Sequence, residues 1–241
     1  MKGVFIAGTD TGVGKTVLAA ALLSCLRARG MDAVPLKPVQ TGCRREGARL
    51  VAPDLEFCLA AARFTPAPDE QDLMGPFRYE PACSHHLAAR EAGETISIDA
   101  IETAATELGR RHEFLVVEGA GGVLAPVSEQ YTMLDVMVRL GLPVVLAARP
   151  GLGTLNHTLL SLRELKRAEL FVAAVVMVDL APVEWGKIEQ DNFRAIGRMG
   201  GIPAVEHLPY LGPLRAGSPD PAVFSKGACP PIIELVEMLA G

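Results

Sequence analysis

Short runs of apolar residues alternate along the whole chain with longer segments whose apolar residues recur at helical spacing. The short runs are continuous stretches of Val, Ala, Leu and Ile, which is typical of strands covered on both faces. They predict strands at Gly3–Ala7, Ala33–Leu36, Phe114–Val117, Pro143–Ala148, Val172–Val178 and Ala204–Leu208. The longer segments predict helices at Lys15–Arg29, Asp54–Ala62, Ile98–Arg110, Met133–Leu140, Thr154–Lys166, Gly186–Met199 and Ile232–Leu239.

Strands that alternate with helices in this way predict an α/β fold, with a parallel sheet flanked by helices on both faces. Two stretches interrupt the alternation. Residues Phe64–Pro81 are rich in proline and charge and predict a long connection that lies over a site. Residues Gly212–Pro231 are rich in proline and glycine. Neither stretch resembles a linker between domains, so we expect residues 1–241 to form one domain.

The composition narrows the class of protein. Of the 241 residues 49% are apolar, and 28 acidic against 23 basic side chains give a net charge of −5. This excludes a disordered chain, and the lack of a Lys/Arg cluster disfavours a nucleic-acid partner. No apolar run approaches the roughly 20 residues that span a bilayer, and no secretory signal is visible. Five cysteines without a CxxC motif indicate free thiols in a reducing compartment, so we expect a cytoplasmic protein.

The segment between the first predicted strand and helix, residues 8–16, reads Gly-Thr-Asp-Thr-Gly-Val-Gly-Lys-Thr. A loop in this position turns backbone N–H groups inward around a polyphosphate, and the helix N-terminus adds positive potential. Lys15 would reach the terminal phosphates, and the Thr16 hydroxyl would bind Mg²⁺. The strict pattern has glycine at position 9, where this chain has threonine. A glycine-rich turn that binds nothing is the alternative, but the strand–loop–helix context favours a P-loop NTPase-like fold.

Further polar residues end strands or begin helices. Glu118 closes a buried strand at the carboxyl edge of the sheet, where a carboxylate can help to hold Mg²⁺. Asp54 is either a cap of its helix or a second metal ligand. Lys37, at the end of the second strand, either stabilises a transferred phosphoryl group or extends into solvent. The backbone N–H groups of residues 152–157 can bind a carboxylate, unless Thr154 is simply a cap.

Together these segments resemble the dethiobiotin synthetase family of P-loop enzymes. The matching segments are GTDTGVGKT (8–16), KPVQTG (37–42), Asp54, VEGAGG (117–122) and LGTLNH (152–157). The resemblance implies an ATP-dependent ligase of biotin biosynthesis that carboxylates 7,8-diaminopelargonic acid with CO₂ and closes it to dethiobiotin, ADP and phosphate. It implies a carbamate and a carbamic–phosphoric anhydride as intermediates.

The resemblance also implies roles for individual residues. Those implied to bind the nucleotide are Gly12, Val13, Gly14, Lys15, Thr16, Val17, Asp54, Glu118, Gly119, Ala120, Gly121, Val178, Asp179, Leu208, Pro209 and Tyr210. Those implied to hold Mg²⁺ are Thr16, Asp54 and Glu118, and those implied to be catalytic are Thr11, Lys15 and Lys37. Those implied to bind the diamine substrate are Thr41, Leu152, Gly153, Thr154, Leu155 and Asn156. In the family the segment 152–156 comes from the neighbouring subunit, which implies a homodimer with substrate sites at its interface.

The chain departs from the family at three places, one of which is Leu208-Pro209-Tyr210, which matches the family's second base-binding stretch only in outline. Val178 stands before Asp179 where the family often has an asparagine that recognises adenine. We therefore expect the protein to use other nucleoside triphosphates in addition to ATP. In Ser84-His85-His86-Leu87-Ala88-Ala89 a histidine replaces a proline of the family. Adjacent histidines invite a metal-site hypothesis, but neighbours on an extended segment point to opposite faces. We therefore favour a structural or interface role for His85 and His86.

Two other classes of protein share such a loop. A regulatory or partitioning ATPase would have a second lysine where this chain has Asp10, and a membrane- or DNA-binding surface. The synthetase half of a cobyrinate amidotransferase would be followed by a glutaminase domain, for which 241 residues leave no room.

Overall fold

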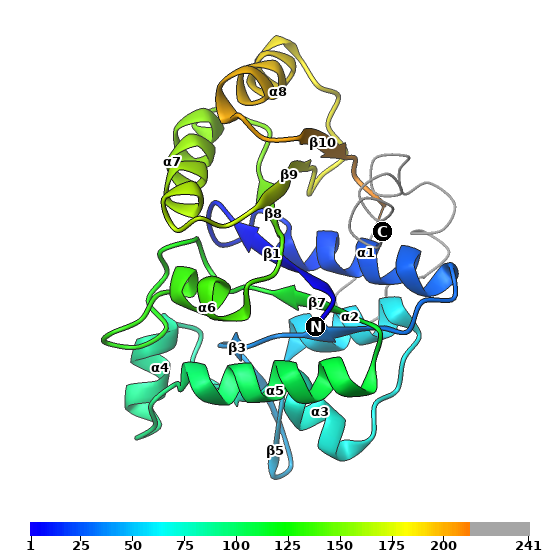
Figure 1. The fold of residues 1–241 in the computed structure, drawn as a ribbon, viewed down its shortest axis with the longest axis vertical. Helices are drawn as coiled ribbons and strands as arrows, with labels where there is room; N and C mark the ends of the chain where they lie inside the picture. The colour runs from blue at the N-terminus through cyan, green and yellow to red at the C-terminus, as the bar shows by residue number, and fades with distance from the viewer. Residues whose placement is uncertain (213–241) are drawn as a thin grey trace.

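The computed structural model describes residues 1–212, and its centre is a six-stranded parallel sheet (Figure 1). The strand order is β10-β9-β8-β1-β7-β2, so the strand before the glycine-rich loop lies inside the sheet between two neighbours. The six predicted strands are confirmed within one residue at each end. Their bounds are β1 Gly3–Gly8, β2 Ala33–Leu36, β7 Phe114–Glu118, β8 Val144–Ala148, β9 Val172–Val178 and β10 Ala204–Leu208.

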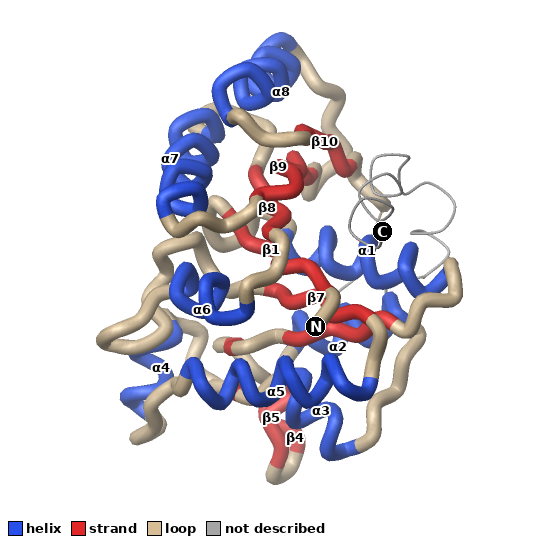
Figure 2. Tube along the Cα trace, in the orientation of Figure 1, coloured by secondary structure: helices blue, strands red, loops and turns tan. Residues whose placement is uncertain are grey.

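Helices cover both faces of this sheet, as the continuous apolar strands predict (Figure 2). Helices α1 (Lys15–Ala28) and α2 (Pro53–Ala62) pack on one face. The other face carries α5 (Ile98–Arg111), α6 (Met133–Leu140), α7 (Thr154–Arg167) and α8 (Lys187–Gly200). Consecutive residues of strand β1 therefore pack in two different hydrophobic cores, one on each face of the sheet. Phe5 packs on the face covered by α5 to α8, whereas Val4 and Ile6 pack on the face covered by α1.

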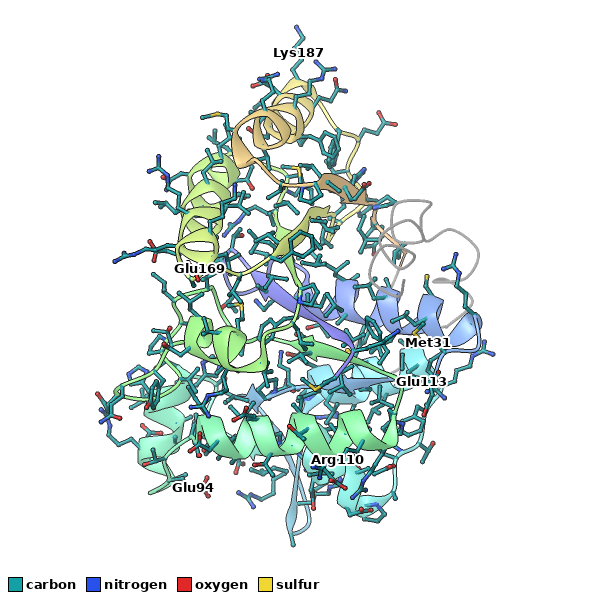
Figure 3. The ribbon with its side chains drawn as sticks, viewed as in Figure 1. Met31, Glu94, Arg110, Glu113, Glu169 and Lys187 are labelled. Carbon is teal, nitrogen blue, oxygen red and sulfur yellow. The ribbon has the colours of Figure 1, made fainter. Side chains whose placement is uncertain are left out.

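These helices confirm the predicted ones within two residues at either end. The predicted helix Ile232–Leu239 lies outside the described residues, as does all of the proline- and glycine-rich stretch after Gly212. The side chain of Lys187 points outward at the top of the view (Figure 3), and Arg110 and Glu169 are exposed as well. No helix within residues 1–212 is long and apolar enough to cross a membrane.

The prediction of a long connection over a site for Phe64–Pro81 was wrong, because the stretch contains regular elements and none of its residues lines the cleft described below. It contains helix α3 (Pro68–Met74) and strand β6 (Phe77–Arg78). Pro68 is the first helical residue, where its missing N–H costs no bond, and the Glu70 carboxylate accepts a hydrogen bond from the Ala67 N–H. Strand β6 pairs with β3 (Val39–Gln40), so the stretch supports the chain just after Lys37.

The expectation of an extended segment at the two histidines was also wrong. His85 and His86 begin helix α4 (His85–Glu91), in which neighbouring side chains diverge by about 100°. His85 is buried, whereas His86 is half-buried. The remaining strands, β4 (Arg44–Glu46) and β5 (Arg49–Val51), form a hairpin that projects from the body, where Arg44 and Arg45 are exposed.

Candidate functional site

The glycine-rich loop joins β1 to α1 and opens at the carboxyl edge of the sheet, as the sequence predicts. Gly12 and Gly14 adopt left-handed backbone angles, with φ of 69° and 95°. Glycine adopts these angles without the steric cost that a Cβ atom brings.

Gly14 is also the point where the loop touches strand β9. A Cβ atom on Gly14 would lie 2.5 Å from Cγ1 of Val178, much closer than van der Waals contact allows. Val178 is buried, and it packs directly beneath the loop. The residue that the family resemblance places at the base is therefore also a support of the phosphate loop.

The ammonium of Lys15 lies inside the curve of the loop. Its Nζ donates to the backbone oxygens of Asp10 and Gly121, each at 2.8 Å. Lys15 thereby ties the glycine-rich loop to the segment that follows β7. Burial, and then the nearby charge of Lys37, lower the pKa of Lys15 to about 8.

Lys37 is buried between two carboxylates rather than extended into solvent. Its Nζ lies 2.6 Å from Oε1 of Glu118 and 2.8 Å from Oδ2 of Asp54. Glu118 Oε1 also accepts a hydrogen bond of 2.7 Å from the Thr16 hydroxyl. Lys37, two carboxylates and the Thr16 hydroxyl, which come from four separate segments of the chain, therefore meet around one point next to the phosphate loop.

The charges of this cluster depend on one another. Burial by itself lowers the pKa of Lys37, but the attraction of Glu118 and Asp54 outweighs it and raises the pKa above its usual value. Burial raises the pKa of the Glu118 carboxyl, while the charge of Lys37 and the hydrogen bonds from Lys37 and Thr16 oppose the rise. A buried carboxylate of this kind is stable only while a cation lies beside it.

The position of Asp54 in its helix excludes one of its two predicted roles, that of a helix cap. The residue that precedes helix α2 is Ala52, and Pro53 is the first helical residue, so Asp54 is not the N-terminal cap. Its side chain is partly exposed and turns toward Lys37 and Glu118. Asp54, Glu118 and Thr16 present hard oxygen donors at one point, which fits the ligands that Mg²⁺ prefers.

A cleft of about 950 Å³ opens over this cluster. Predicted site residues that line it are Thr11, Gly12, Gly14, Lys15, Thr16, Val17, Lys37, Thr41, Asp54, Glu118, Ala120 and Gly121. Ser84, His85 and Pro126 line it as well, and the sequence predicted none of them as site residues. The signal that could have found His85 was the Ser84–Ala89 segment, which we assigned a structural or interface role.

The residues implied to contact the base lie mostly in a neighbouring hollow of about 630 Å³. Asp179, Pro209 and Tyr210 line it, whereas Leu208 is buried beneath. Both carboxylate oxygens of Asp179 have partners: Trp185 Nε1 donates to Oδ1 at 3.0 Å, and His207 Nε2 lies 2.7 Å from Oδ2.

The segment after β8, implied to bind the substrate, does not line this chain's own cleft. Leu152 is 88% exposed, and Asn156 is exposed as well. The residue that precedes helix α7 is Gly153, so Thr154 is not its cap; its buried hydroxyl instead lies 3.3 Å from that of Thr158. Nearby, Arg149 forms a 2.9 Å ion pair with Asp10 of the phosphate loop.

The sequence matches known proteins over most of its length. A family model described as an AAA domain matches residues 2–218. An ATP-dependent dethiobiotin synthetase of Anaeromyxobacter sp. (strain Fw109-5) is 41% identical over 181 residues, which are 73% of this chain and 76% of that protein. A protein of the same name from Anoxybacillus flavithermus is 34% identical, over 88% of this chain and 93% of its own. A third, from Haloferax mediterranei, is 39% identical over 93% and 88%.

Solved structures with the same fold are more distant in sequence. The MinD cell division protein of Aquifex aeolicus superimposes with a TM-score of 0.63 at 13% identity, over 99% of this chain and 96% of that chain. A ParA family ATPase of Chlorobium tepidum has a TM-score of 0.56 at 12% identity, over 99% and 98%. At these identities the likeness shows the P-loop NTPase fold alone.

Proposed function

The chain belongs to the ATP-dependent dethiobiotin synthetase family, and on this premise we propose that it joins CO₂ to 7,8-diaminopelargonic acid and closes the product to dethiobiotin. It is an ATP-dependent ligase of biotin biosynthesis. One amine captures CO₂ as a carbamate, the carbamate receives the terminal phosphoryl group of ATP, and the second amine displaces phosphate. The observation that supports this reaction is the buried Lys37 ammonium between Asp54 and Glu118, beside the phosphate loop.

The two lysines divide the charge stabilisation between them. Lys15 lies within the loop and acts on the phosphates, and Lys37 lies further into the cleft and acts on the carbamate and the group in transfer. The two ammonium groups are held in place in a partly buried site. They stabilise negative charge strongly, because neither the protein nor water has to reorient when that charge develops during the reaction. Thr11 and Thr41 line the same cleft, where Thr11 is proposed to take part in catalysis and Thr41 to contact the diamine.

Thr16, Asp54 and Glu118 are the residues that would hold Mg²⁺. When bound, the ion would neutralise part of the negative charge of the phosphates. The oxygen-only donor set and the convergence of the three side chains support this assignment.

We further propose a homodimer in which residues 152–156 of one protomer bind the substrate carboxylate of the other. The exposure of Leu152 and Asn156, and their absence from this chain's own cleft, support a role toward another molecule. The base site is proposed to accept other nucleoside triphosphates. Val178 offers no amide, and both oxygens of Asp179 are engaged by Trp185 and His207.

The experiment that tests the function is phosphate release from MgATP with and without the diamine and bicarbonate, repeated with CTP and GTP. Phosphate that appears only with the diamine, together with dethiobiotin detected by mass, is the expected result. Phosphate released at the same rate without the diamine would contradict the proposal and favour an ATPase switch.

A further inference from the structure

The hollow next to strand β9 has a wall of two stacked aromatic rings, which belong to Trp185 and His207. The indole of Trp185 lies over the imidazole of His207, with 3.8 Å between the ring centroids and 36° between the planes. Both side chains are only half-buried, so parts of both rings remain open to the hollow. Phe193 of helix α8 packs against the indole at a centroid distance of 5.8 Å.

Asp179 holds the two rings in place. Trp185 Nε1 donates to its Oδ1 at 3.0 Å, and His207 Nε2 donates to its Oδ2 at 2.7 Å. The side chain of Asp179 is only 5% exposed, so its carboxylate faces the two rings and not the open hollow. A buried carboxylate needs such donors, and here each of its oxygens fixes one ring. Asp179 is therefore a positioning residue for the stacked pair.

The stacked pair lies next to the place where the phosphates of a nucleotide would bind. Val178, the residue before Asp179, packs beneath Gly14 of the phosphate loop. Leu180, the residue after Asp179, lines the cleft. The end of strand β9 thus leads directly from the phosphate loop to the hollow, and a nucleotide whose phosphates lie in the loop can place its base there.

We propose that the base of the nucleotide stacks on the Trp185–His207 pair, and that this pair makes the protein prefer purine over pyrimidine nucleotides without separating adenine from guanine. This inference rests on the proposed function, to which it adds the class of nucleotide. Every base has a π-face, so stacking tolerates different bases. Its strength grows with the number of atoms in contact, which is larger for two fused rings than for one.

The side chains at this end of the sheet favour the face of a base over its edge. Val178 has no hydrogen-bonding side chain, and both oxygens of Asp179 already accept hydrogen bonds from the two rings. Glu184, Gln190 and Tyr210 line the hollow too, but all three are exposed. An exposed group exchanges a hydrogen bond to water for one to the base, with little net gain. Adenine and guanine differ mainly at their edges, so neither is favoured.

The experiment measures the binding of ATP, GTP, CTP, UTP and inorganic tripolyphosphate by calorimetry, with Mg²⁺ and without the diamine. Tripolyphosphate has no base, so it reports on the phosphate loop alone. For the wild type we expect Kd values for ATP and GTP within about threefold of each other, and CTP and UTP weaker by about fivefold or more. Trp185→Ala should raise the Kd for ATP and GTP by about 5- to 100-fold, the range of base–aromatic stacking. The Kd for tripolyphosphate should stay within about twofold.

Two conservative variants separate stacking from hydrogen bonding. Trp185→Phe keeps an aromatic ring but lacks the N–H that bonds to Asp179, so it should keep the preference for purines and lose less affinity than Trp185→Ala. Asp179→Asn keeps an oxygen that can accept from the indole. It should change the Kd values for ATP and GTP by the same factor, because the carboxylate does not contact the base. A loss confined to GTP would mean that Asp179 recognises guanine, and would overturn the inference.

Three other outcomes would overturn it: CTP binding to the wild type as tightly as ATP does, Trp185→Ala keeping the Kd for ATP within about twofold, or Trp185→Ala weakening tripolyphosphate as much as ATP. The last would mean that the indole only supports the phosphate loop. If Trp185→Ala does not fold, wild-type fluorescence decides, because Trp185 is the single tryptophan of the chain. ATP and GTP should quench its emission and tripolyphosphate should not; equal quenching by all three, or none by ATP, overturns the inference.

Failure of this inference can be told apart from failure of the proposed function. Dethiobiotin formation by the wild type is assayed separately from nucleotide binding. A wild-type protein that forms dethiobiotin but lacks the preference for purines refutes the stacking inference alone. A wild-type protein that binds none of the nucleotides refutes the proposed function, and this inference with it.

Discussion

Replacing Lys37 by methionine removes one ammonium from the cleft and keeps most of the side-chain volume. The two carboxylates it contacts respond differently. Asp54 is partly exposed and can recover hydration, whereas the side chain of Glu118 is only 4% exposed and cannot. Breaking a buried ion pair by deleting one partner costs about 3–5 kcal/mol, because a charge is left without compensation. For a chain of this size that corresponds to a fall in Tm of roughly 6–20 °C.

The pH dependence of stability identifies the cause. Without Lys37, the pKa of the buried Glu118 rises further, so the folded protein binds a proton that the unfolded chain has released. A carboxyl whose pKa is raised on folding contributes stability at low pH, and that contribution is lost as the pH rises. The free energy of unfolding of Lys37→Met should fall more steeply than that of the wild type between about pH 5 and 8, by at most about 1.4 kcal/mol per pH unit.

Urea unfolding across that pH range measures both quantities, and Lys37→Met/Glu118→Gln is the matched control. The double variant has no buried charge at position 118, so it should lose less stability than Lys37→Met and show the wild-type slope. Two results would show that Glu118 is not the carboxylate that Lys37 neutralises. One is a loss of less than about 1 kcal/mol in the free energy of unfolding of Lys37→Met, and the other is a double variant whose free energy of unfolding still falls steeply with pH.

Three further predictions concern the ligands. Glu118→Gln should raise the Mg²⁺ concentration for half-maximal turnover by roughly tenfold or more, and an unchanged Mg²⁺ titration would remove Glu118 from the metal site. Val178→Asn should increase the preference for ATP over CTP and GTP, measured from the fluorescence of Trp185, the single tryptophan of the chain; a constant ratio would mean that residue 178 does not face the base. The kcat/KM for MgATP should fall as the pH rises through about 8, because Lys15 then loses the charge that attracts phosphate. In Lys15→Arg the charge persists, so the same fall in that variant would assign it to another group.

The sheet and its main helices were predictable because their pattern is repeated and long. Continuous apolar runs such as Val172–Val178 are typical of parallel strands, and each was separated from the next by a helix of eight or more residues. Helices α3 and α4 have seven residues each, barely two turns, so they show no periodic apolar face. Their stability comes from tertiary packing, which a local pattern does not contain.

In the candidate site, the roles of residues inside a sequence motif were predictable, whereas contacts between residues that folding brings together were not. Lys15 and Thr16 follow from the loop itself. The contact between Lys37 and Glu118 joins residues 81 positions apart, so the sequence suggested both groups without showing that one neutralises the other. The place of His85 in the cleft depends on how helix α4 packs, which is not visible in the order of the residues.

Because the six strands run parallel, the phosphate loop, Lys37 and Glu118 all lie at their carboxyl ends. Among residues 1–212, the opposite rim holds the N-terminus and the connections that lead from a helix into the next strand. Gly141 occupies one of these, between α6 and β8; it is exposed, has a φ of 61°, and nothing lies within 4 Å of where its Cβ would be. A reporter peptide or an immobilisation tag spliced in after Gly141 would therefore be carried on the rim away from the cleft, leaving ligand entry open.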